Sequence, residues 1–103
     1  MTRVGVLKID FHISDSSSLK EKRSVLRHIK DRVRRCFNVS ISEVNNHDKW
    51  QLATFAVSCV SNDKKHVDAM LNKVKNFFEK NRYIVVGWIL ESYVIVETHS
   101  TSA

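Results

Sequence analysis

The segment from Ser18 to Phe37 constrains the fold of this chain most strongly, because its pattern is that of an amphipathic helix. It contains no Pro or Gly. Ser18 and Glu21 form a capping box, in which each side chain accepts from the backbone N–H of the other, so we expect the helix to begin at Ser18. The stripe expected to be buried recurs every three or four residues, has Val25 at its edge, and comprises Leu19, Lys22, Leu26, Ile29, Val33 and Cys36.

A second stripe of the same segment is basic, and we call it the basic row. It steps by three and four residues and comprises Lys20, Arg23, Arg27, Lys30 and Arg34. At about 100° per residue, the row lies roughly 120° from the centre of the buried stripe, so it flanks the packed face of the helix. Three more cations share this segment: Lys22, Arg32 and Arg35.

The net charge of the chain is concentrated in this helix. Residues 18–37 hold eight Lys or Arg and two acids, a balance of +6, whereas the rest of the chain is neutral with nine of each sign. A solvated helix usually mixes signs to gain favourable pairs, while a row of like charges repels itself. The pattern favours a polyanionic partner; the alternative is a surface helix whose charge only maintains solubility.

Alternating apolar residues predict strands over 4–13, 38–44, 50–60 and 83–97, and a 3.6-residue period predicts a second helix over 63–81. Gly87 marks either a bulge or the true start of the last strand, whose two faces the sequence does not assign. The order β-α-β-β-α-β with right-handed crossovers predicts an α+β, ferredoxin-like sandwich: a four-stranded antiparallel sheet with two helices on one face. We expect one domain over 1–98 and a frayed tail over 99–103.

Several classes of function are disfavoured by composition. No apolar run approaches the ~20 residues that span a membrane, and the N-terminus lacks a signal-peptide pattern, so we expect a cytoplasmic protein. Cys36 and Cys59 fall on apolar faces and are expected to be buried thiols. The five histidines lack metal-binding spacing, and the loop over 14–17 has neither Gly nor Arg to cradle a phosphate. We expect no cofactor, no small-molecule substrate and no enzymatic activity.

Five short motifs resemble the YlxP-like family of uncharacterised bacterial proteins, in register between Val4 and Phe78. They are Val4–Leu7, Ser18–Arg23, Phe37–Ser40, Asp48–Gln51 and Val60–Asp63. The resemblance implies a ferredoxin-like fold. The genes of that family often lie beside those for translation initiation and ribosome maturation, which implies an association with RNA or ribosomes. No catalytic residues carry over.

Two functional hypotheses follow. In the first, this is a non-enzymatic, RNA- or ribosome-associated domain whose basic row contacts phosphates of structured RNA, assisted by Lys22, Arg32 and Arg35. Lys22 has an alternative, which is to extend along the edge of the core. In the second, the chain is a homo-oligomer, such as a homodimer, or a protein-partner module whose basic helix docks on an acidic protein surface. It uses the open face of the sheet, where Val6, Leu52 and Val60 are expected.

Overall fold

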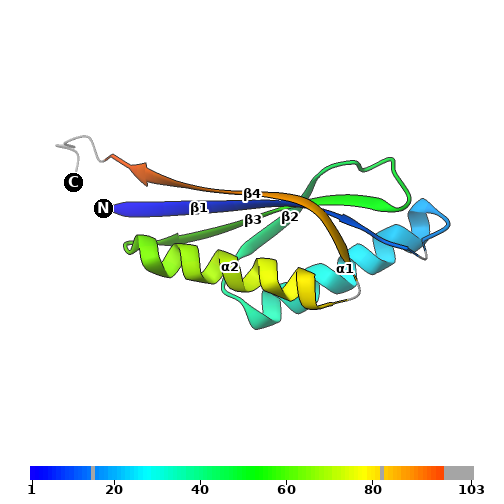
Figure 1. The fold of residues 1–103 in the computed structure, drawn as a ribbon, viewed down its shortest axis with the longest axis horizontal. Coiled ribbons are helices and arrows are strands. Elements are labelled where there is room, and N and C mark those ends of the chain that lie inside the picture. The colour runs from blue at the N-terminus through cyan, green and yellow to red at the C-terminus, as the bar shows by residue number, and fades with distance from the viewer. Residues whose placement is uncertain (15, 82, 97–103) are drawn as a thin grey trace, which may run out of the picture.

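The structure is a computed structural model and describes residues 1–14, 16–81 and 83–96. Its elements are β1 (Thr2–His12), α1 (Leu19–Cys36), β2 (Ser40–Asn45), β3 (Leu52–Ser61), α2 (Lys64–Lys80) and β4 (Ile84–Ile95). The strands form one antiparallel sheet in the order β2-β3-β1-β4, and both helices cover the same face (Figure 1). The predicted ferredoxin-like fold is confirmed, while the predicted tail over 99–103 lies outside the described residues.

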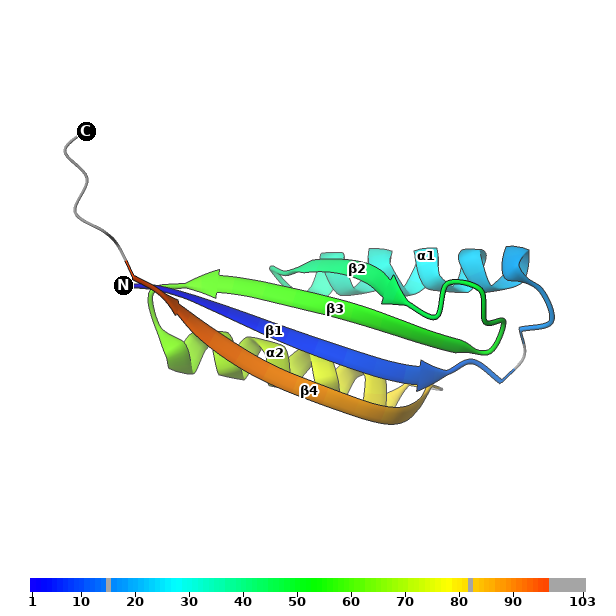
Figure 2. The same ribbon diagram turned by 90° about the horizontal axis from the view of Figure 1, so that it is seen from above.

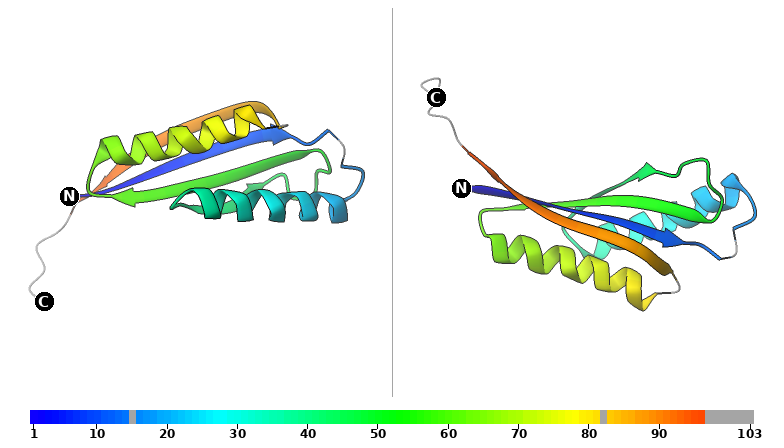
Figure 3. Two further views of the ribbon diagram at one scale, coloured as in Figure 1. Left: turned by 90° about the horizontal axis from the view of Figure 1, so that it is seen from below. Right: turned by 45° about the horizontal axis from the view of Figure 1, so that its top comes forward.

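The two helices divide one face of the sheet between them. Seen from above and from below, α1 lies beside β2, and α2 lies over the central strand β1, where it contacts both neighbouring strands, β3 and β4 (Figures 2 and 3). Each edge strand therefore has a different helix beside it. No helix of the described ranges is long and apolar enough to cross a membrane.

The core forms between this face and the buried stripes of the helices. Leu7, Ile9 and Phe11 of β1 are fully buried, as their alternation predicts. The Phe11 ring lies 5.4 Å from the ring of Phe55 on β3 and 5.1 Å from that of Phe78 on α2, centroid to centroid. These tilted aromatic pairs join three elements in one cluster.

The start of α1 differs from the prediction by one hydrogen bond. The Ser18 hydroxyl accepts from the Glu21 N–H at 3.1 Å, as expected for the N-cap. The Glu21 carboxylate, however, accepts from the N–H of Ser17 at 2.9 Å and from its hydroxyl at 3.0 Å. Ser17 offers two donors where the N–H of Ser18 offers one. These bonds, the backbone bond first, lower the pKa of Glu21.

Gly87 lies beside a β-bulge, the first of its two predicted roles. Asp10 pairs with Gly87 and Phe11 with Val85, so Val86 is an extra residue on β4. The strand itself begins earlier, at Ile84.

Beyond the bulge, the register fixes the faces of β4 that the sequence left open. Leu90 pairs with a core residue of β1 and Trp88 with the next one, so both point to the helical side. Ile89, Tyr93 and Ile95 alternate with them and point to the open face.

The prediction for the cysteines is wrong for one of the two. Cys59 is 4% exposed, and burial raises the pKa of its thiol, whereas Cys36 is exposed. Cys36 is the last residue of α1, and Phe37 directly after it packs against the core, 6.0 Å from the ring of Phe77. The buried stripe of α1 therefore ends one turn earlier, at Val33.

Gly5 permits close approach of α2 to β1, and we expect Gly5→Ala to destabilise the fold. An added Cβ would lie 2.6 Å from Leu71 Cδ1 and closer still to Val67 Cγ1. Such overpacking costs about 1–3 kcal/mol of unfolding free energy in urea melts. Gly87→Ala is the matched control: its Cβ meets nothing within 4 Å, so it should be neutral or stabilising by up to about 1 kcal/mol. Equal unfolding free energies for the two variants would contradict the close approach of α2 to β1.

The two thiols should react at very different rates. In the native protein, iodoacetamide should modify Cys36 readily, since it is exposed, and Cys59 only as fast as the chain opens. Mass spectrometry of a labelling time course measures both sites, with a urea-unfolded sample as the control for equal access. Rapid labelling of Cys59 in the native protein would show that β3 is not packed as described.

Candidate nucleic-acid interface

The basic row lies along one exposed flank of α1. Lys20, Arg23, Arg27 and Arg34 are exposed, and Lys30 is half-buried. With a rise of 1.5 Å per residue, the row extends over about 21 Å. None of its members takes part in any ion pair found within the described residues. Among the residues that the structure describes, no acid therefore lies at ion-pair distance from the row.

The row borders the edge strand β2. Arg34 donates from Nη2 to the carbonyl oxygen of Ile41 at 3.2 Å, which places this flank of α1 beside β2. Arg35 is also exposed, but it lies about 100° further round the helix, where its Nε is 3.4 Å from the carbonyl oxygen of Asp31. It belongs to the same helix but not to the same face.

Lys22 is not part of this surface, so its predicted role as an auxiliary phosphate contact is wrong. It is 2% exposed, as its position on the buried stripe predicts. Its ammonium donates to the carbonyl oxygen of Asn46 at 2.6 Å and lies 3.1 Å from Glu43 Oε2. A buried ammonium needs such partners, and they hold it away from solvent.

Asn46 extends the interaction of Lys22 into the sheet. Its φ of 60° is left-handed, a conformation that Asn tolerates in turns. Its side-chain nitrogen donates to Thr54 Oγ1 at 2.8 Å, and the Thr54 hydroxyl donates to Asp10 Oδ1 at 2.6 Å. This polar chain, from Lys22 through Asn46 and Thr54 to Asp10, fixes α1 relative to the hairpin and the central strands.

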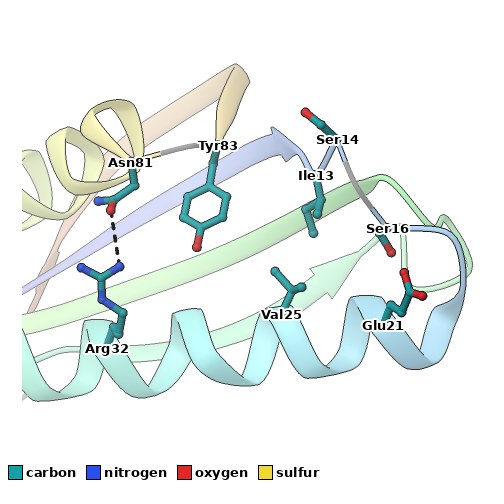
Figure 4. A pocket seen from close by; sticks show the side chains of 8 residues that line it. All are labelled: Ile13, Ser14, Ser16, Glu21, Val25, Arg32, Asn81 and Tyr83. Atoms are coloured by element: carbon teal, nitrogen blue, oxygen red, sulfur yellow. Dashed lines mark hydrogen bonds between the residues drawn. The ribbon is translucent and has the colours of Figure 1, made fainter.

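Arg32 also leaves the predicted surface, because it reaches across to α2. Its guanidinium carbon lies 5.0 Å above the Phe77 ring, and its Nη1 lies 3.4 Å from Asn81 Oδ1 (Figure 4). The guanidinium is thus held between the helices by a cation–π contact and a hydrogen bond. Of the eight predicted contact residues, the structure brings the five of the basic row together on one flank.

A pocket of about 530 Å³ opens beside Arg32. Figure 4 shows polar side chains at both ends and apolar ones between them: Arg32, Asn81 and Tyr83, then Ile13 and Val25, then Ser14, Ser16 and Glu21. The Ser16 hydroxyl donates to the Ser18 carbonyl, and the Glu21 carboxylate is held by Ser17. These two groups are therefore not arranged as a nucleophile and its base.

The open face of the sheet is the second predicted surface, and its apolar side chains lie mainly along β4. Its central strands contribute Val6, which is half-buried, and Val60, which is 63% exposed. β4 adds Ile89 at 57%, Tyr93 at 50% and Ile95 at 48% exposed. The sequence pattern did not assign these last three to a face.

The order of elements, the antiparallel sheet and the one-sided helices define a ferredoxin-like α+β domain with a basic first helix. Residues 4–87 match the family described as "Protein of unknown function (DUF503)", and the chain belongs to this family. The Uncharacterized protein YlxP of Bacillus subtilis (strain 168) is 40% identical over 76 residues, which cover 74% of this chain and 83% of the relative. The resemblance predicted from the motifs is confirmed.

We expect Lys22→Met to destabilise the fold, although lysine is a residue type that usually lies at the surface. The change leaves the Glu43 carboxylate and the Asn46 carbonyl without their common partner. Loss of a hydrogen bond to a charged group costs about 1.5–3 kcal/mol in urea melts. Lys20→Met removes the same charge from an exposed site and should stay within about ±0.5 kcal/mol.

A double-mutant cycle separates the ion pair from packing. In the background of Glu43→Gln, Lys22→Met should cost less than in the wild type, since no carboxylate is left unpaired. If Lys22→Met is as mild as Lys20→Met, the buried ammonium does not hold the hairpin.

Proposed function

We propose that this protein is a non-enzymatic, cytoplasmic RNA- or ribosome-associated domain that binds the phosphates of structured RNA through the basic row of α1. The observation that carries the proposal is the concentration, on one flank of α1, of positive charge that forms no ion pair within the described residues. Five cations extend over about 21 Å of helix. The chain outside this helical segment is neutral.

The repulsion between the like charges of the basic row supports an anionic ligand for it. Neighbouring members are three or four residues apart, where like charges destabilise a helix by roughly 0.2–0.5 kcal/mol per pair. On α2, by contrast, Lys64 pairs with Asp68 at 2.6 Å and Lys75 lies 3.9 Å from Glu79. Within the described residues, Lys and acid side chains thus pair along α2, whereas the row of α1 forms no ion pair, although Asp31 stands at helical-neighbour spacing from Arg27 and Arg34. Repulsion without benefit to folding is typical of a surface used for an anionic partner.

The geometry favours the shape of folded RNA over unpaired bases. A row on a straight helix presents charges to a phosphate backbone, and arginines can contact each phosphate through two donors. Base stacking would need aromatic side chains on the open face of the central strands. The inner strands have Lys8, Asp10 and the buried Thr54 at these positions.

Filter binding to a structured RNA hairpin tests the proposal. Five phosphate contacts predict that log K falls with log salt with a slope of about −3.5 to −4.5 between roughly 50 and 200 mM salt. The double variant Arg23→Glu/Arg27→Glu should weaken binding. It should also reduce the magnitude of the slope by the share that about two of the five contacts contribute. Both side chains are exposed, so the unfolding free energy of the variant should lie within about 1 kcal/mol of that of the wild type.

The control variant is Lys65→Glu/Lys73→Glu, which changes the net charge equally at exposed positions of α2. It should retain most of the affinity. Equal losses for the two variants would show attraction by net charge without a site, and no binding at low salt would refute the proposal. Capture of a protein from nuclease-treated lysate through the basic row would instead identify an acidic protein partner.

A further inference from the structure

β4 carries an unusual share of the exposed apolar surface. Of the large hydrophobic side chains that are exposed in the described residues, most lie between positions 84 and 96: Ile84, Val86, Trp88, Ile89, Tyr93, Ile95 and Val96. Glu91 is the single charged residue in this stretch. Clustered apolar surface of this kind usually marks an interface.

β4 is also an edge strand with little protection along its outer side. Among the described strands it is hydrogen-bonded to β1 alone, and the bulge at Val86 interrupts only its beginning. The other edge strand, β2, is half as long, contains a register shift and has one outward carbonyl capped by Arg34. Long, apolar, uncharged edges tend to pair with another strand. The two edges of this sheet are therefore not equivalent.

We propose that β4 pairs in antiparallel fashion with β4 of a second copy of this chain, so that two sheets become one continuous sheet of eight strands. A strand is its own partner under a two-fold axis perpendicular to the sheet, and the helices of both copies then lie on the same side. This interface is separate from the basic row and does not depend on RNA binding.

The side chains of β4 select the register. A register centred on Glu91 would set two carboxylates directly opposite each other, which is destabilising. A register centred on Ser92 places Ile89 of one copy opposite Ile95 of the other. On the same face it places Glu91 opposite Tyr93, whose hydroxyl already bonds Glu91 within one copy. Apolar residues then meet apolar residues.

The available area fits a dimer of modest affinity. Trp88 and Tyr93 are about half exposed, and Ile89, Ile95 and Val96 are exposed by 48–71%. With usual side-chain areas, these five residues offer up to about 700 Å² of apolar surface over two copies. Since apolar atoms form about 57% of such interfaces, the total is about 1,200 Å², the lower end for stable complexes.

The charge distribution favours a second copy on this side of the molecule. The basic segment lies along β2, at the edge farthest from β4 (Figure 2). Pairing through β4 keeps the two highly charged helices as far apart as the sheet allows, so the repulsion between two cationic chains is smallest in this arrangement.

Sedimentation equilibrium of the nuclease-treated full chain, from about 1 to 300 µM, tests this dimer. We expect a monomer–dimer equilibrium in the wild type. Ile95→Lys should weaken it at least about tenfold, because a lysine on an edge strand blocks pairing. Val60→Lys is the matched control: it replaces an exposed residue of the same open face on the inner strand β3, and it should leave the equilibrium unchanged.

A charge pair tests the register itself. Ile89→Glu alone should weaken the dimer as Ile95→Lys does. The double variant Ile89→Glu/Ile95→Lys places opposite charges across the two-fold axis, so its dimer dissociation constant should return to within about threefold of the wild type. Thermal melts of each variant show whether the monomer is folded. A wild type that is monomeric throughout the range overturns the proposal, as does a dimer that Val60→Lys disrupts and Ile95→Lys does not.

Discussion

The aromatic contacts of Phe11 hold the layers of this domain together. Its ring meets Phe55 of the neighbouring strand, Phe78 of α2 and, at 5.6 Å, Tyr83 on the approach to β4. This cluster fixes α2 over the central strands and against β4. The part of the same face beside β2 is left for α1, whose stripe of Leu26 and its neighbours is buried. The position of the basic flank beside β2 follows from that division.

The chain of contacts from Lys22 completes the placement of α1. A charged residue on a buried stripe is expensive unless its ammonium finds partners, and here the hairpin supplies them through Glu43 and Asn46. The left-handed turn at Asn46 makes this possible, since it presents a carbonyl to the helix and an amide to Thr54. The exposed row on the neighbouring flank is therefore carried by a helix that cannot rotate freely.

Local pattern was sufficient for the elements, their order and most of the core, because periods of 2 and 3.6 depend only on neighbouring residues. The pattern placed Lys22 on the buried stripe, but it did not predict the contact with Asn46, which is 24 residues away in the sequence. Likewise, nothing near Arg32 in the sequence indicates Asn81, 49 residues on. The faces of β4 stayed undecided because this strand is apolar on both sides, and only its pairing with β1 distinguishes them. Contacts between distant segments therefore account for the errors at Lys22 and Arg32 and for the undecided faces of β4.

The two proposed surfaces lie at opposite edges of one sheet, and this separation has a consequence for both. With strands about 4.8 Å apart, a dimer joined at β4 would set its two outer β2 strands about 34 Å from each other. Each basic row would then lie on the same side of an eight-stranded sheet, at one of its two ends. A single short RNA helix would engage one row, whereas a large folded RNA could engage both, and linked binding events raise the apparent affinity without any new contact. Modest affinity at each surface is compatible with firm binding to a large RNA, because the β4 edge and the α1 flank do not compete for the same residues.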